Sequence, residues 1–409
     1  MQQLKIRSSL SQWSVATLAV ACSLVSLNTA RAVYTWQNIQ FGGFASQGYL
    51  QSSDNDYLGK TEDGTFDFRE YGVNASWSHG AWRAGAQVFG QKLGEYGDDK
   101  LKLDWATIDY QPSQYFGIRA GRVKMPRGLY NEALDLDAVR PYVLLPQSVY
   151  DARLRDFNAA FNGAMVFGNV EISKAGSLDY RLFYGHMPLT TDSGAADYFN
   201  NDSPVPVKRI HLDAVRGGAL YWNTPVNGLR FAYSYSAFAH MNSHREGVFQ
   251  DIGPVVVDKY AKTYERHLWS AEYVLGNWTL ATEYGREHAL YNIIVPVLGD
   301  VADYNFESKY YYFAASRRMN SWLELGAYYS HSHEAQYSGS VASPVFPHLK
   351  QGDYALSARF DINEHLSFKL EGHYMEGSGK IFDTPTHPQP LQNRDNSWTL
   401  IAAKVSVVF

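Results

Sequence analysis

Apolar and polar residues alternate with a period of two through most of this chain. In 71–77 and 82–88, every second residue is Trp, Tyr, Val or Ala, and the residues between them are Gly, Asn, Ser, Arg or Gln. The same alternation recurs in 229–235 and 354–360. Successive side chains of a β-strand point to opposite faces, so this pattern predicts strands with one apolar face and one wet face.

We predict about sixteen such strands of roughly 9–15 residues, long enough to cross a bilayer when tilted. Their centres fall near residues 43, 72, 86, 106, 119, 165, 183, 218, 234, 268, 284, 311, 327, 356, 370 and 403. The strands near 43, 106 and 165 have the weakest pattern, so the count could differ by two.

Short and long connections alternate along the chain. The short ones lie near 78–80, 111–115, 174–177, 224–228, 276–277, 318–321 and 362–364. The long ones are 51–64, 91–100, 124–157, 188–213, 241–259, 290–303, 333–350 and 376–394. Short turns on one side of the membrane and long loops on the other are typical of outer-membrane barrels.

The expected fold is therefore all-β, a transmembrane antiparallel β-barrel with long external loops. Five tryptophans lie within about two residues of a short turn, where an aromatic girdle belongs; they are Trp77, Trp82, Trp222, Trp278 and Trp322. The strand that ends at Phe409 is expected to close the barrel against the first one. A soluble propeller or sandwich would also alternate, but its outward face would carry Lys, Glu and Thr, and no blade-length repeat of ~40 residues is found.

Residues 1–32 are similar to a cleavable secretory signal. Lys5 and Arg7 precede an apolar stretch, and Ala30-Arg31-Ala32 places small residues where a signal peptidase reads them. The single cysteine, Cys22, lies in this segment. We therefore predict a signal peptide at 1–32 and a thiol-free outer-membrane barrel at 33–409.

Net charge argues against one class of partner. The formal net charge is −5, and removal of the three basic residues of the signal segment gives −5 − 3 = −8. A mildly acidic chain is a poor candidate for nucleic-acid binding. The 15% aromatic content and a mean hydropathy of −0.33 fit alternating membrane strands with polar loops. No cofactor is expected.

The inward face of the predicted barrel carries both signs of charge. The inward candidates are Arg83, Arg119, Arg181, Arg230, Arg266, Arg359, Lys369, Glu272, Glu283, Glu324 and Glu371. With many Gly and Ser beside them, they predict a wet interior, and sixteen strands leave an aqueous channel. Any of these charges could instead pair with another and only keep the barrel wet.

The connection 124–157 is the longest and the least polar. It holds Leu134, Leu136, Val139, Tyr142, Val143, Leu144, Leu145 and Tyr150, too much apolar surface for an exposed loop. We expect this third long loop to fold into the barrel and narrow the pore. Its acids and bases would then oppose each other across a constriction and filter solutes by size and charge. Arg153, Arg155 and Asp156 could instead belong to the base of the next strand.

The predicted pore-lining and constriction residues come from this loop and the strands beside it. They are Arg83, Arg119, Arg122, Lys124, Arg127, Glu132, Asp135, Asp137, Arg140, Asp151, Arg153 and Arg155. No catalytic or metal-binding residue is predicted.

Residues 103–132 resemble the phosphate-selective porin O/P-like superfamily. In that group a strand of the D-A-x-x-D-Y type leads through a Pro-containing turn to a V-G-R-x-K-x-P-x-G segment. The matches are Asp104, Ala106, Asp109, Tyr110, Pro112, Gly121, Arg122, Lys124, Pro126 and Gly128. The resemblance implies a passive, trimeric porin for small hydrophilic solutes or ions, placed among outer-membrane lipid and lipopolysaccharide of a Gram-negative bacterium. Phosphate itself is not expected, because its selection requires a dense ladder of Lys and Arg.

Two other functions stay open. A structural or adhesive barrel would use its long loops as the active surface. An outer-membrane enzyme is less favoured, because the 13 His occur without a G-x-S-x-G or H-E-x-x-H motif. The segment His331–Glu334 could bind a metal, but two His at i and i+2 in a loop are usually solvated.

Overall fold

The computed structural model describes residues 34–36, 38–137, 140–200, 205–249, 253–296, 299–338, 341–342, 349–383 and 388–409. The predicted signal peptide, 1–32, lies outside the described residues. No helix in the described part of the chain is long and apolar enough to cross a membrane.

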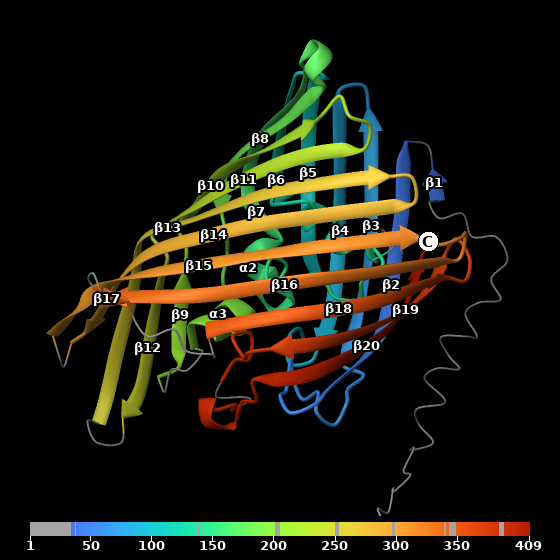
Figure 1. Cartoon of the computed structure of the whole chain (residues 1–409). Helices are drawn as coiled ribbons and strands as arrows, with labels where there is room; N and C mark the ends of the chain where they lie inside the picture. The colour runs from blue at the N-terminus through green and yellow to red at the C-terminus, as the bar shows by residue number, and fades with distance from the viewer. Residues whose placement is uncertain are drawn as a thin grey trace, which may run out of the picture.

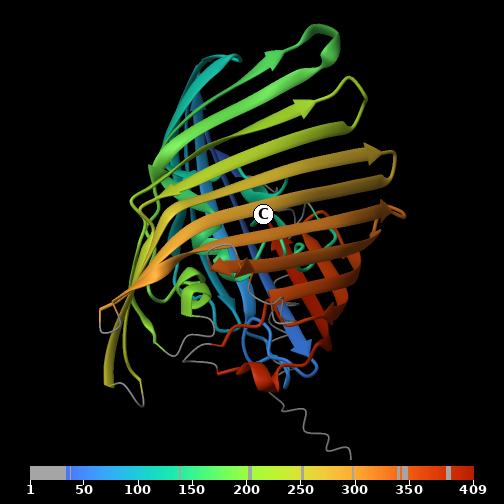
Figure 2. The same ribbon diagram turned by 60° about the vertical axis from the view of Figure 1, so that its left-hand side comes forward.

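Sixteen of the described strands close into one antiparallel barrel, as predicted (Figures 1 and 2). They are β2 (Ile39–Ser52), β3 (Phe68–His79), β4 (Trp82–Leu93), β5 (Lys102–Ser113), β6 (Phe116–Lys124), β7 (Ala160–Glu171), β8 (Ser177–His186), β10 (Ala214–Asn223), β11 (Leu229–Ala239), β13 (Gly253–Leu275), β14 (Trp278–Val295), β15 (Gly299–Arg318), β16 (Leu323–Ser338), β18 (Lys350–Asp361), β19 (Leu366–Glu376) and β20 (Ser397–Val408). Each predicted strand centre falls inside one of them. β20 closes the barrel against β2, with Ser406 paired to Ser46 and Ala403 to Tyr49.

Shorter strands and helices extend or fill the barrel. The additional strands are β1 (Tyr34–Trp36), β9 (Val207–His211), β12 (Asn242–Phe249) and β17 (Val341–Ala342). The helices are η2 (Asn131–Ala133), η4 (Ala152–Leu154), α2 (Arg155–Asn158), η5 (Ser173–Ala175), α3 (Gly194–Asn200) and η7 (Leu391–Asn393).

The seven predicted short turns are confirmed, and the girdle tryptophans lie beside them. Trp77, Trp82 and Trp278 are 38%, 46% and 44% exposed on the outer wall. Phe409 lies at this end, where its backbone N–H donates to the Gly43 carbonyl at 2.9 Å. The short turns and the aromatic girdle therefore share one end of the barrel, as expected for the inner side of an outer-membrane barrel.

Three of the predicted long loops were wrong in extent. The described residues within 241–259, 290–303 and 333–350 are mostly in strands, because β13 has 23 residues, β15 has 20 and β16 has 16. β9 and β12 pair with the start of β13 and widen this extension. These ends carry charges on both faces, so the apolar–polar alternation that marks lipid-facing strands is lost although the backbone pairing continues.

The lumen is not wet throughout, which corrects the sequence-based expectation. A lumenal apolar core fills it between β6 and β15. Its members include Val123, Met125, Phe157, Phe161, Met165, Phe183, Val215, Phe238, Tyr264, Tyr291 and Phe306, with Ala195 of α3. Figure 1 shows α2 behind the front wall of strands. Here both faces of the strands are apolar, so alternation alone could not reveal the packing.

Candidate functional site

The third long loop, 124–157, folds into the barrel, as predicted. The backbone N–H groups of Val143 and Leu144 each donate to one oxygen of the Glu371 carboxylate, both at 2.9 Å. Glu283 of β14 accepts another loop N–H at 3.0 Å. Three backbone N–H groups of the loop are therefore bound by carboxyl groups on two parts of the wall, which fix the loop in place.

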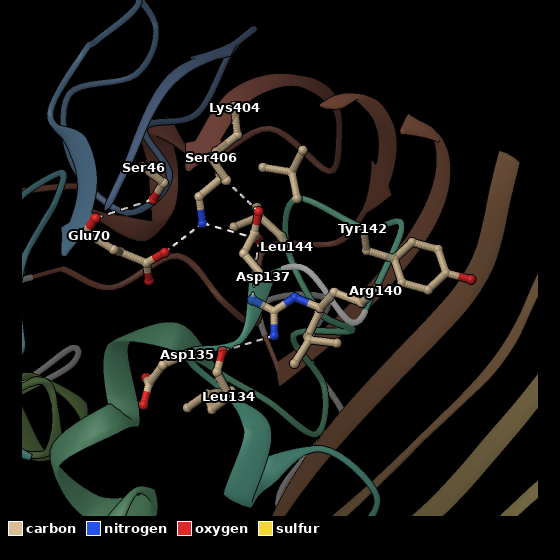
Figure 3. A network of polar contacts seen from close by, with 12 residues as sticks. Ser46, Glu70, Leu134, Asp135, Asp137, Arg140, Tyr142, Leu144, Lys404 and Ser406 are labelled. Carbon is tan, nitrogen blue, oxygen red and sulfur yellow. Dashed lines mark hydrogen bonds and ion pairs between the residues drawn. The ribbon is translucent and has the colours of Figure 1, made fainter. Parts of the chain in front are cut away.

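One ionic cluster fixes the loop to the closing strands (Figure 3). We define the Asp137 cluster as Asp137 and Arg140 of the loop with Glu70, Lys369, Lys404 and Ser406 of the wall. The Asp137 carboxylate accepts from the Ser406 hydroxyl at 2.6 Å and lies 3.3 Å from Lys404 Nζ. Burial would raise the pKa of Asp137, but Lys404, Lys369 and Arg140 outweigh it and hold that pKa below its usual range.

A second cluster joins the loop to β4, β5 and β6. We define the Asp135 cluster as Gln87, Asp104, Lys124, Asp135 and Arg155. Arg155 lies 2.5 Å from both Asp104 and Asp135, and Lys124 is paired with both acids. Burial would raise the pKa of Asp135, but Arg155 and Lys124 keep it low. Two carboxylates therefore face two cations, with no net charge.

Members of the Asp135 cluster line two cavities. The outer cavity, about 250 Å³, is lined by external-loop residues such as Glu95 and Asp192 and by Asp104 and Arg155 of the cluster. The inner cavity, about 420 Å³, is lined by Gln87, Lys124 and Asp135 from the cluster and by wall residues of β3 to β6. The cluster thus contributes side chains to both an outer and an inner cavity.

The remaining predicted wall residues lie around these cavities. Arg119 lines the inner cavity and forms a two-point ion pair with Asp109, both contacts at 2.8 Å. Arg122 lines the outer cavity and donates to the Asp104 carbonyl at 2.9 Å. Glu132 lines the inner cavity and pairs with Arg181. Arg83 shares the inward face of Gln87, and its cross-strand neighbour is Asp109.

Three predicted loop residues are buried in the packing of the loop. Arg127 is 4% exposed and donates to the Val149 carbonyl at 2.8 Å. Arg153 is 3% exposed, pairs with Asp151 at 2.7 Å and stacks on the Phe382 ring at 3.7 Å. Lys380 also contacts Asp151, at 3.4 Å. Arg127 and Asp151 hold the loop and line neither of these cavities, whereas Arg153 holds the loop and also lines the outer cavity.

Sequence reasoning missed Gln87 and Asp104 as site residues. Asp104 belongs to the D-A-x-x-D-Y match, but its role depends on a β-bulge. In β5, Trp105 pairs with Gln87 and Leu103 with Val88, so Asp104 has no cross-strand partner. A bulge of this kind re-aims a side chain. Gln87 could have been predicted from the sequence, because it lies four residues after Arg83 and therefore on the same inward face of β4.

The histidines form no metal centre in the described part of the chain. His331 and His333 lie in β16, not in a loop. Among the described residues, no group of three or more His, Cys, Asp or Glu could hold a metal ion. His348 and His387 lie outside the described residues.

No protein-family model matches the chain, and no curated protein matches its sequence. Solved structures do match. OmpT of Vibrio cholerae, expressed in the outer membrane, has a TM-score of 0.57 at 8% identity, over 92% of this chain and 100% of its own. OmpF of Salmonella typhi has a TM-score of 0.56 at 13% identity, over 91% of this chain and 97% of its own. An anion-selective porin from Comamonas acidovorans has a TM-score of 0.52 at 12% identity, over 91% and 99%.

At such low identities the similarity shows the fold alone. The chain is a sixteen-stranded antiparallel barrel of the kind formed by bacterial outer-membrane porins. The narrower resemblance to the phosphate-selective superfamily stays a prediction.

Proposed function

We propose that this chain is an outer-membrane porin, a channel for passive diffusion of ions and small hydrophilic solutes. The observation that carries the proposal is the pair of cavities, about 250 and 420 Å³, each lined by members of the Asp135 cluster, and we propose that the cluster is the narrow point between them. A solute would cross from the outer cavity to the inner one past Asp104, Lys124 and Asp135. No chemistry on the solute is needed, and we propose no enzymatic activity.

The charge balance of the cluster supports weak selectivity. Opposed acids and bases across a narrow point create a transverse field that favours small polar solutes over large or apolar ones. A phosphate-selective channel is a poorer candidate, since Arg119, Lys124 and Arg155 are each paired with a carboxylate. The solute class we propose is therefore small, hydrophilic and not restricted to one sign of charge.

The location and assembly are part of the same proposal. We propose export by a cleaved signal peptide at 1–32, insertion into a Gram-negative outer membrane with its lipopolysaccharide, and assembly as a homotrimer. The girdle of Trp77, Trp82 and Trp278 supports membrane insertion, since exposed aromatic rings at one end of a barrel favour an interface.

The test is conductance of the purified chain in a planar bilayer. We expect discrete insertion steps, each followed by a persistent ohmic current. A barrel that inserts but carries no current would contradict the channel and favour the structural or adhesive alternative. Hydrolysis of a lipid or peptide by the purified chain would contradict our proposal that the chain has no enzymatic activity, provided that a Ser or His substitution abolishes this hydrolysis.

A further inference from the structure

An unbroken row of basic side chains crosses the outer wall of five neighbouring strands. Cross-strand pairing joins its members directly: His267 of β13 to Arg286 of β14, Arg286 to Lys309 of β15, Lys309 to His333 of β16, and His333 to Lys350 of β18. We call these five residues the basic row. This pairing makes each side chain the direct neighbour of the next on the wall, and because the strands of a barrel tilt, the row runs obliquely around it.

The basic row faces outward. The strand neighbours of these residues, such as Arg266, Ser308 and Ser332, are 4%, 6% and 4% exposed and point into the barrel. The side chains of Arg286 and Lys309 are instead 52% and 51% exposed. Because successive side chains of a strand alternate between faces, the whole row lies on the wall that faces lipid in the proposed membrane location.

An aromatic row lies directly below the basic row, on its membrane side. Tyr233 pairs with Trp269, Trp269 with Tyr284, and Tyr284 with Tyr311. Tyr and Trp rings mark the boundary between the hydrocarbon and the headgroups. Arg286 is eight residues from the girdle residue Trp278. That is roughly 26 Å along the strand, or about 20 Å in height at a typical tilt, close to the ~25 Å apolar band.

The row carries more positive charge than its nearest acid can neutralise. Glu307 lies 2.7 Å from Arg286 and 3.5 Å from Lys309. No carboxylate among the described residues forms an ion pair with His333 or Lys350. Glu265 and Glu376 lie near the two ends of the row. The Glu265 carboxylate accepts a hydrogen bond from the Tyr235 hydroxyl at 3.0 Å, and Glu376 is the cross-strand neighbour of Gly352. Like charges on directly paired strands destabilise a sheet, and a bound anion would offset that cost.

We propose that the basic row binds the phosphate groups of an anionic lipid of the outer leaflet. This inference rests on the proposed membrane location. It adds a binding site on the outer wall that is separate from the channel. Phosphate oxygens accept charge-assisted hydrogen bonds from Arg and Lys, and the row presents Arg286, Lys309 and Lys350 on the outer wall toward the end of the barrel that carries the long loops. The acyl chains would lie against the aromatic row below.

The test compares retention of lipid A with retention of its dephosphorylated form, which has the same acyl chains. The full chain is reconstituted in phosphatidylcholine nanodiscs with both lipids, washed in detergent and analysed by native mass spectrometry. We expect ~tenfold preference for the phosphorylated lipid, and its loss in the triple variant Arg286→Gln, Lys309→Gln, Lys350→Gln. The matched variant Lys60→Gln, Lys174→Gln, Lys208→Gln removes the same charge from exposed sites elsewhere and should keep the preference.

Three results would overturn the site. The first is that the wild type shows no preference for the phosphorylated lipid, and the second is that the triple variant shows the same preference as the wild type. The third is that millimolar inorganic phosphate displaces lipid A at constant ionic strength, which would indicate a site for free phosphate. A chain that does not enter nanodiscs at all would instead count against the proposed membrane location. The two failures are therefore distinguishable.

Discussion

Asp104 is the residue on which the candidate constriction most depends. It contacts Gln87 at 3.0 Å, Lys124 at 3.1 Å and Arg155 at 2.5 Å. Its place in the chain could be predicted from the local motif, but its direction could not, since the bulge opposite Gln87 and Val88 breaks the period of two. In the same way, the sequence identified Lys124 and Asp135 as opposed charges, but it did not show which wall strands they contact.

Neutralising one member of the Asp135 cluster should change ion selectivity in a predictable direction. Lys124→Gln leaves one excess negative charge at the narrow point, so the reversal potential in a salt gradient should move toward cations. Asp135→Asn should move it toward anions. In a watery passage one charge at a few ångströms contributes about 1 kcal/mol, or about fivefold in permeability ratio. Glu376→Gln, on the outer wall, is the control. Shifts of the same sign for both cluster variants would contradict this placement of the passage.

Asp197 of α3 predicts a pH dependence outside the membrane-spanning strands. Burial and nearby Glu95 raise its pKa to about 6, against the opposing effect of Arg153. The folded state therefore binds this proton more tightly than the unfolded state. The stability that the proton contributes is full below about pH 4 and is lost as the pH rises through about 6.

Hydrogen exchange of the α3 amides checks this pH dependence. The free energy of opening at these amides, calculated from exchange rates corrected for the intrinsic rate, should fall by about 1 kcal/mol between pH ~4 and pH ~8. This figure allows for the partial exposure of the Asp197 carboxyl group to solvent. Asp197→Asn should remove the fall. Asp192→Asn is the control, because a hydrogen bond with Thr190 lowers the pKa of Asp192 and gives the opposite slope. An unchanged fall in the Asp197 variant would show that another group titrates.

At the scale of elements, the loop inside the barrel is held by the wall at its middle. Glu371 accepts two loop N–H groups and also contacts His373 Nε2 at 3.0 Å, while His373 Nδ1 lies 2.9 Å from Asp353. All three wall residues are buried, on β18 and β19. This arrangement fixes the backbone of the loop at Val143, away from the constriction itself.

Glu371→Gln should loosen the loop without changing the volume of the side chain. The amide keeps one acceptor oxygen but places an NH₂ group against the second loop N–H, so one hydrogen bond is lost and two donors meet. A hydrogen bond to a charged group contributes about 1.5–3 kcal/mol, and unfolding in urea should report a loss of that size. Single-channel current should also become noisier. Glu376→Gln, outward on the same strand, is the matched control, and an equal loss there would contradict a specific hold on the loop.

Among the properties of the strands, their positions in the chain were the most predictable and their lengths the least. All sixteen centres could be read from the sequence because lipid on one side imposes a strict alternation. Beyond the lipid that constraint ends. β13 continues through Asp258 and Lys262 with polar residues on both faces, so a pattern that reports lipid contact fails there although the hydrogen bonding persists.

At the scale of the whole molecule, the candidate passage is off-centre. The lumenal apolar core fills the side from β6 to β15, whereas the inner cavity follows β3 to β6. The sequence-based prediction of a wet lumen rested on the number of inward-facing charged residues. It could not show that Phe161, Phe183 and Phe238 of the nearby strands β7, β8 and β11 turn their rings inward and pack together with α2 and α3, since that depends on how the loops fold into the barrel.

The most direct test of the proposed passage uses single cysteines, because the chain beyond Cys22 contains none. Thr107→Cys places a thiol in the inner cavity, and Ser308→Cys places one on the inward face of β15, on the packed side. Conductance is recorded before and after a charged, water-soluble thiol reagent is added. We predict that Thr107→Cys loses most of its current and that Ser308→Cys is unaffected. A block at Ser308→Cys with none at Thr107→Cys would contradict a passage along β3 to β6.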